Sequence, residues 1–396
     1  MKRTKNGGQL RRAAAAPRAV LTVWALGALA AWATDARPAV EPIDWNRARE
    51  LRQKSQQGSM LTPDEQAYLR RAVDERRRGG GRGQTTPGAV PRDRTGLVPL
   101  NEMTGDRQYQ GQDGGLYGGG RNEPPPAHAQ AALAEAARIV PVDANGRPAR
   151  DGRIVLLSVG MSNTTQEFSR FQDLADRDPE KAPSVVIVDG AQGGQAAAQW
   201  AASPDSRVWQ TAAARLKAAG VTPDQVQAVW LKQANIRPTE PFPAHTRKLE
   251  ADIKTILHLL KEKFPNVRIA YLSSRIYAGY ASTPLNPEPY AYESAFAVRE
   301  LILNQIEGGA DLNYDPAKGE VRSPLLLWGP YLWADGVTPR KSDGLMWKRE
   351  DLREDGTHPS ATSGRDKVAK LLLAFFKSDP TAKRWFERPP AAGTRS

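Results

Sequence analysis

The sequence contains no cysteine and only four histidines in 396 residues. The absence of cysteine excludes disulfide bonds, even in an oxidising compartment, and it excludes a thiolate as nucleophile or metal ligand. The shortage of histidine restricts imidazole chemistry to four positions. His245 and His258 show no metal-ligand spacing to a second histidine or carboxylate, so we expect neither a metal nor another cofactor. We expect His258 to be partly buried in a helix and His245 to lie at the surface.

Acidic residues are absent from the first 33 positions, which contain six lysines and arginines and supply half of the formal net charge of +12. The rest of the chain is only mildly basic, which argues against nucleic acid as a partner. An apolar run over residues 19–33 ends in Ala31-Trp32-Ala33, a pattern typical of a secretory signal cleaved near Thr34. The alternative is a retained N-terminal anchor, although a spanning helix needs roughly 20 residues. The sequence therefore predicts an exported protein: periplasmic, cell-envelope or secreted.

The segments that flank the main domain have distinct compositions. Residues 34–95 predict a charged helical hairpin, whose second helix starts at Thr62 and Pro63 and reaches about Asp74, followed by an Arg/Gly-rich linker over 76–84. Residues 381–396 predict a disordered tail. Residues 96–150 predict a Gly/Pro-rich arm, with a short helix over 127–140, and no Gly-Lys-Ser/Thr follows its glycines as in a phosphate-binding loop. We expect the arm to pack on the main domain through Leu97, Leu100, Met103, Leu116 and Tyr117.

Residues 151–380 form the predicted main domain, in which short apolar runs alternate with amphipathic helical stretches. Continuous apolar strands separated by helices favour a parallel sheet covered on both faces. The predicted fold class is α/β: a three-layer α/β/α sandwich with a five-stranded parallel sheet. The predicted strands are 153–159, 184–188, 226–231, 267–272 and 325–328, and the predicted helices are 168–177, 208–219, 246–263, 292–306 and 364–376.

Ligands of such sheets bind beyond the carboxyl ends of the strands. The first predicted strand leads into a turn that contains Ser162, the second into a turn with Gly193 and Gly194, and the third into Asn235. Asp355-Gly-Thr-His358 precedes the last helix. These residue types are the components of a site for acyl transfer, because a serine hydroxyl needs an imidazole to take its proton and the imidazole needs a partner that orients it.

The roles follow from this chemistry. We predict Ser162 as nucleophile, His358 as base and Asp355 as the acid that orients it. The oxyanion donors are the N–H of Ser162, the N–H of Gly194 or Gly193, and the side chain of Asn235. Most of the aromatic residues before the Asp-His loop are expected to pack in the core. Trp333 is the exception, and we predict that its ring contacts the substrate. The candidates for substrate contact are Asn163, Gly193, Gln195, Arg275, Tyr277 and Trp333.

This order of residues resembles the SGNH (GDSL-like) hydrolase superfamily over residues 153–376, which implies a flavodoxin-like fold and a metal-independent serine esterase. The resemblance also implies Gly194, rather than Gly193, as the oxyanion donor of the second turn, because Gln195 follows it. The Gly-Met-Ser-Asn turn at Ser162 is similar to the Gly-Gln-Ser-Asn turn of the sialate O-acetylesterase branch of carbohydrate esterases. Together with the N-terminal signal pattern, the resemblance implies an exported enzyme that hydrolyses acyl esters, in particular acetyl esters of carbohydrates. Two positions depart from the superfamily pattern, since Met161 replaces the usual aspartate and Gln233-Ala234-Asn235 replaces Gly-x-Asn-Asp.

Those departures leave two other functions open. One is a non-catalytic module on the same fold that binds carbohydrate or the cell envelope. The other is a basic scaffold that binds an anionic polymer through residues 44–95.

Overall fold

The structure is a computed structural model that describes residues 43, 44, 47, 48, 51, 54, 61–79 and 92–388. The predicted signal or anchor over residues 1–33 and its cleavage near Thr34 lie outside these residues. Among the described residues, no helix is both long enough and apolar enough to span a membrane. The chain divides into two compact units, Met1–Gly80 and Gly81–Ser396.

The first unit contains helix α2, Pro63–Gly79. Its start is capped reciprocally: the Glu65 N–H donates to Thr62 Oγ1 at 3.3 Å, and the Thr62 N–H donates to Glu65 Oε2 at 2.8 Å. This confirms the predicted helix start at Pro63. The helix continues past Asp74 into the segment expected to be linker, because the residues 75–78 are glutamate and arginine, which are good helix formers.

The second unit is built on a five-stranded sheet with the order β2-β1-β3-β4-β5. Every pair of neighbouring strands is parallel, as the apolar runs predict. The chain moves from β1 to one neighbour, β2, and returns to the other side of β1 as β3, so the strand order reverses at β1. The strands are β1 Ile154–Gly160, β2 Val185–Val188, β3 Val226–Lys232, β4 Ile269–Ser273 and β5 Leu325–Trp328.

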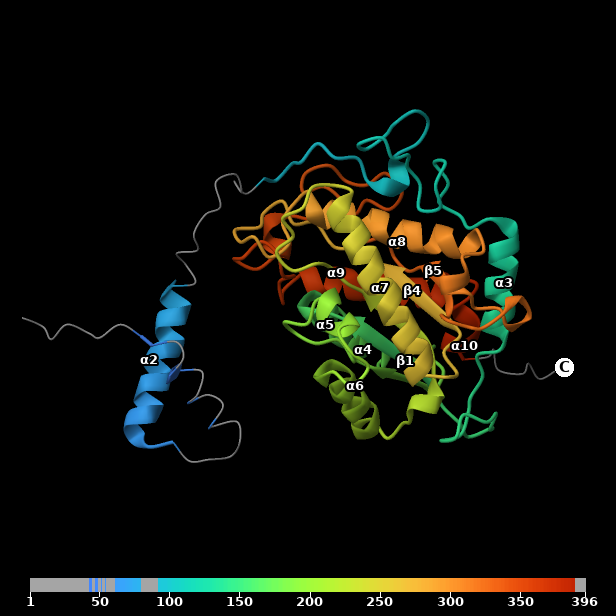
Figure 1. The fold of residues 1–396 in the computed structure, drawn as a ribbon, viewed down its shortest axis with the longest axis horizontal. Helices are drawn as coiled ribbons and strands as arrows, with labels where there is room; N and C mark the ends of the chain where they lie inside the picture. Colours follow the sequence, from blue (N-terminus) through green and yellow to red (C-terminus); the bar gives the residue numbers. More distant parts are fainter. Residues whose placement is uncertain are drawn as a thin grey trace, which may run out of the picture. The chain divides into compact units, whose positions relative to one another are not determined.

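Helices cover both faces of the sheet and complete the predicted three-layer sandwich (Figure 1). α4 packs against α9, while α7 packs against both α5 and α8. All 16 residues of β1, β4 and β5 are buried, which explains why these strands are continuously apolar rather than alternating. The helices of this unit are α3 Pro126–Ala137, α4 Ser162–Ala175, α5 Ala197–Ala201, α6 Arg207–Ala218, α7 Ala244–Lys263, α8 Tyr290–Ile306, α9 Gly364–Ser378 and α10 Lys383–Phe386.

The Gly/Pro-rich arm is fastened to the sheet domain by hydrophobic and polar contacts. Leu100, Met103 and Tyr117 are buried in the main core, and Leu97 and Leu116 pack against it.

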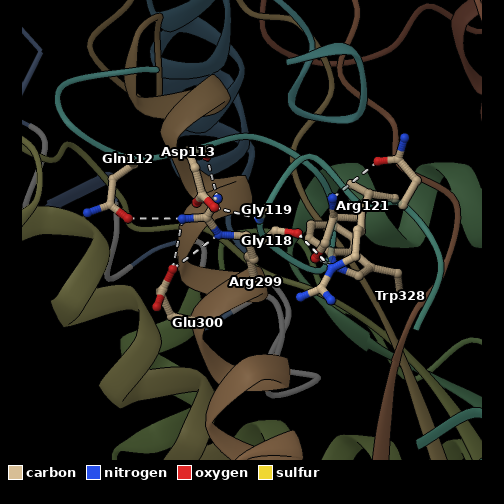
Figure 2. A network of polar contacts seen from close by, with 10 residues as sticks. Gln112, Asp113, Gly118, Gly119, Arg121, Arg299, Glu300 and Trp328 are labelled. Atoms are coloured by element: carbon tan, nitrogen blue, oxygen red, sulfur yellow. Dashed lines mark hydrogen bonds and ion pairs between the residues drawn. The ribbon is translucent and has the colours of Figure 1, made fainter. Parts of the chain in front are cut away.

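A buried arginine of α8 holds the same arm by hydrogen bonds, as Figure 2 shows. Arg299 Nη1 donates to the carbonyl and to Oδ1 of Asp113, and Nη2 donates to Gln112 Oε1. Trp328 Nε1, at the end of β5, donates to the carbonyl of Leu116 at 2.6 Å. These bonds satisfy backbone carbonyls that a glycine-rich segment without regular structure would otherwise leave unpaired.

The C-terminal segment corrects one prediction. We expected a disordered tail from residue 381, but residues 383–386 form α10, in which Trp385 and Phe386 are buried. Phe386 stacks on Phe171 and Phe376, with ring centroids 6.2 and 5.4 Å apart. The prediction was wrong for residues 381–388 because these aromatic rings complete the core beside α9. Residues 389–396 lie outside the described part of the chain.

Candidate active site

Ser162 is the first residue of α4, directly after β1. The turn between them requires glycine at position 160, where a Cβ would lie 2.3 Å from Thr164 Oγ1 and 2.4 Å from the carbonyl oxygen of Lys232. The N–H of Ser162 belongs to the first turn of the helix, where N–H groups have no acceptor within the helix and the helix dipole is positive. The nucleophile candidate therefore stands where the backbone can also stabilise negative charge.

Ser162, His358 and Asp355 form one hydrogen-bonded chain. Ser162 Oγ lies 2.7 Å from His358 Nε2, and His358 Nδ1 lies 2.6 Å from Asp355 Oδ2. Burial acts to raise the pKa of Asp355, but hydrogen bonds from the His358 side chain and from two backbone N–H groups outweigh it and lower the pKa to about 2. Asp355 is thus held as a carboxylate beside the imidazole. The structure brings together the three residues that the sequence predicted as partners.

The loop that contains Asp355 and His358 is anchored from two other elements. Asn163 Nδ2 donates to the carbonyl of Thr357 at 2.9 Å, and Arg275 Nη2 donates to the same oxygen at 3.3 Å. Asn163 and Arg275 line the pocket beside Ser162, as substrate-contacting residues would. Their observed hydrogen bonds, however, hold the loop in place.

Gly356 is required by the conformation of this loop. Its φ of +62° is in the left-handed region, and a Cβ there would lie 1.8 Å from the carbonyl oxygen of Tyr280. Gly356→Ala is expected to displace the loop and to lower both the melting temperature and any turnover that depends on His358. Gly344→Ala is the matched control, because Gly344 has a φ of +71° and nothing within 4 Å of the added Cβ. Equal losses in the two variants would show that the contact with Tyr280 is unimportant.

Of the two candidate glycines after β2, only Gly194 lines the pocket. Its φ of +77° favours glycine, and among the described residues no acceptor is found for its N–H. Gln195 also lines the pocket, whereas Gly193 does not. The structure therefore supports Gly194 over Gly193 as the donor from this turn.

Asn235 lines the same pocket and follows β3. Its Nδ2 donates one hydrogen to the carbonyl of His245 at 2.8 Å. A primary amide has a second hydrogen, which this contact leaves available. Asn235 is thus oriented by the protein and still has a donor for an oxyanion.

Tyr277 and Trp333 are not brought to the pocket, which corrects their selection as substrate contacts. Both side chains are fully buried and do not line it. Tyr277 OH donates to the carbonyl of Arg92 at 2.7 Å, and Trp333 Nε1 donates to Glu288 Oε1 at 2.8 Å. Residues that follow a strand in sequence lie near its carboxyl end, but these two side chains point into the core. The other aromatic residues before the Asp-His loop, Trp328, Tyr331 and Trp347, are buried as expected.

His245 was expected at the surface, and this prediction was wrong. Its side chain is buried, with Nε2 2.5 Å from Glu293 Oε2, and Tyr109 OH donates to the other oxygen of Glu293 at 2.5 Å. Glu293 lies 48 residues away in α8, so no local sequence signal indicates the pairing. His258 is half-buried in α7, as predicted, and its Nε2 lies 2.6 Å from the carbonyl oxygen of Asp311.

A buried ion pair beneath the site was also missed. Lys232, the last residue of β3, pairs with Glu167 of α4, and both side chains are inaccessible to solvent. Burial lowers the pKa of Lys232 to about 8 and raises the pKa of Glu167. The pair lies between the strand that leads to Asn235 and the helix that begins with Ser162. In the part of the chain that the structure describes, no group of three or more histidine and acidic side chains could hold a metal ion.

Comparisons with known proteins give only distant structural likenesses. No family model matches the chain, and no curated protein matches it in sequence. A protein named as a candidate acylhydrolase from Bacteroides fragilis is 13% identical, with a TM-score of 0.33, over 64% of this chain and 96% of that one. A salicylyl acyltransferase from a tetracycline biosynthetic pathway is 15% identical, with a TM-score of 0.32, over 59% of this chain and 58% of that one.

The periplasmic domain of a lipopolysaccharide acetyltransferase from Salmonella Paratyphi A is 14% identical, with a TM-score of 0.30, over 63% of this chain and 94% of that one. Likenesses this low assign the chain to no family. The α/β fold class is established by the sheet and helices themselves, and a function must be argued from the site.

Proposed function

We propose that this protein is an exported serine esterase that hydrolyses short-chain acyl esters, such as acetyl esters, on a carbohydrate. The observation that carries the proposal is the hydrogen-bonded chain from Ser162 Oγ through His358 to Asp355, with distances of 2.7 and 2.6 Å. It lies at the carboxyl edge of a parallel sheet, where such folds bind ligands. Ser162 lines a pocket of about 200 Å³ that a small ester can enter.

The mechanism uses side chains and backbone N–H groups of this site. Ser162 Oγ attacks the ester carbonyl while His358 Nε2 takes its proton, and the Asp355 carboxylate stabilises the imidazolium that forms. The oxyanion accepts hydrogen bonds from the N–H groups of Ser162 and Gly194 and from the second hydrogen of Asn235 Nδ2.

Collapse of this intermediate breaks the bond to the alcohol, which leaves with the proton from His358. Water then attacks the acyl-enzyme, and His358 takes the proton of that water. A second collapse releases the carboxylic acid and returns the proton to Ser162.

The carbohydrate part of the proposal comes from the resemblance of Gly160-Met161-Ser162-Asn163 to the turn of the sialate O-acetylesterase branch. The export part comes from the N-terminal signal pattern. A module that only binds carbohydrate is the alternative, motivated by Met161 and by the changed residues around Asn235. Binding alone does not need a serine, a histidine and an aspartate aligned by hydrogen bonds, so the geometry favours catalysis.

Covalent labelling tests this proposal. A fluorophosphonate probe reacts with a serine that an imidazole activates, so the purified protein is expected to be labelled at Ser162, as checked by mass spectrometry of the labelled peptide. Ser162→Ala should abolish the labelling. A wild-type protein that stays unlabelled, yet is retained on an acetylated polysaccharide column, would support the binding module instead.

A further inference from the structure

One exposed apolar side chain lies at the edge of the candidate active site. Three large hydrophobic residues of the described chain are exposed: Leu133 at 45%, Ile236 at 45% and Val337 at 44%. Single exposed hydrophobic residues are normal on protein surfaces. Ile236 differs from the other two because it lines the pocket that contains Ser162 and His358.

Hydrogen bonds between two loops hold Ile236 beside a second apolar residue. The Arg237 N–H donates to the carbonyl of Leu285 at 2.8 Å, and Asn286 Nδ2 donates to the carbonyl of Asn235 at 3.0 Å. These bonds flank Ile236 and Leu285 and join the loop after β3 to the loop before α8. Both residues line the pocket, so together they make an apolar wall.

The surface that lines the pocket is mostly apolar, and several of its polar side chains are bound to the backbone. Asn163 and Arg275 donate to the carbonyl of Thr357, Asn235 donates to that of His245, and Asn286 donates to that of Asn235. One donor of each of these four side chains is thus taken by a backbone oxygen, whereas Arg275 Nε has no partner among the described residues.

The pocket is larger than an acetyl group requires. Its volume is about 200 Å³, which gives room for several water molecules. Water against an apolar wall makes few hydrogen bonds, so an apolar group that displaces it gains binding free energy.

We propose that the preferred ester of this enzyme carries an apolar chain of about four carbons or more next to the scissile bond, bound against Ile236 and Leu285. This inference rests on the proposed esterase function and deepens it, since it makes acetyl the smallest group accepted rather than the best. The chain belongs either to the acyl group or to the alcohol, depending on which side of the scissile bond faces the wall.

Two substrate series test the inference and separate these sources. In the first, the acyl group of a 4-nitrophenyl ester is lengthened from acetate to butyrate to hexanoate. In the second, acetate esters of ethanol, butanol and hexanol are compared, and all rates are divided by the alkaline hydrolysis rate of the same ester. Each buried methylene is expected to raise kcat/KM about fourfold, so butyrate, with two more methylenes, should exceed acetate by about fifteenfold if the chain is on the acyl side. A rise in the alcohol series alone would place the same chain on the alcohol.

Ile236→Ser is expected to lower the butyrate-to-acetate ratio by about threefold or more, whereas Val337→Ser is the matched control and should leave the ratio unchanged. The inference is overturned if neither series shows a gain with length, or if Ile236→Ser leaves the ratio at the wild-type value. Failure of the proposed function has a different outcome, in which the wild-type protein hydrolyses none of these esters and is not labelled by the fluorophosphonate.

Discussion

Replacing Ser162 by alanine is expected to lower kcat on a short-chain ester by about 10³-fold or more. The variant loses the oxygen that would form the acyl-enzyme, and His358 is left without a hydroxyl to activate. In serine hydrolases the loss of the nucleophile removes up to about 10⁶ in turnover, and the remaining rate comes from the oxyanion donors and from binding. The measurement is the steady-state hydrolysis of 4-nitrophenyl acetate by purified protein, with correction for spontaneous hydrolysis.

Ser169→Ala is the matched control for this variant. Ser169 is exposed in the same helix, and its hydroxyl only donates to the carbonyl of Thr165 at 2.6 Å. This control is expected to retain wild-type turnover. If Ser162→Ala kept more than about a tenth of the wild-type kcat, Ser162 would not be the nucleophile, and the assignment of His358 as its base would fail with it.

Replacing Lys232 by methionine is expected to destabilise the fold by about 3–5 kcal/mol. The reason is that Glu167 would remain as a charge with no accessible surface and no partner, since Lys232 is its only ion-pair partner among the described residues. Its Oε1 has no hydrogen bond even with the lysine present. The measurement is the free energy of unfolding in urea, with the dependence on denaturant compared between variants.

The double variant Lys232→Met/Glu167→Leu distinguishes the loss of the ion pair from the cost of leaving Glu167 as an unpaired buried charge. Replacing both partners by apolar residues is often neutral or stabilising, so the double variant should recover most of the stability. Lys254→Met provides a surface control, because Lys254 and Asp311 are an exposed pair, and such pairs contribute about 0–1 kcal/mol. A single variant as stable as the wild type would contradict the expected cost of leaving Glu167 without its partner.

The fold and the main residues of the site could be predicted because their signals are local. Five apolar runs, each followed by a helical pattern, are enough to indicate a covered parallel sheet. Ser162 and Asn235 could be named because residues that follow parallel strands gather at one edge of the sheet. Asp355 and His358 are three residues apart, so one loop brings the carboxylate to the imidazole without help from the rest of the fold.

The errors concern side chains whose direction depends on distant residues. Tyr277 and Trp333 follow strands just as Ser162 does, yet they point into the core, where Arg92 and Glu288 accept their hydrogen bonds. His245 is buried because Glu293 and Tyr109 come from other elements to meet it. Residues 381–388 are ordered because Phe386 stacks on the rings of Phe171 and Phe376.

Hydrophobic periodicity and turn chemistry within the chain thus determine the order of strands and helices, the start of α2 at Pro63 and the pairing of Asp355 with His358. The tertiary structure alone decides that Tyr277 and Trp333 point away from the pocket, that His245 is buried against Glu293, and that Ile236 and Leu285 form a wall beside Ser162. The physical reason is that local patterns act over a few residues. Contacts between distant segments depend instead on strand order, on the path of the loops and on the packing of the complete core.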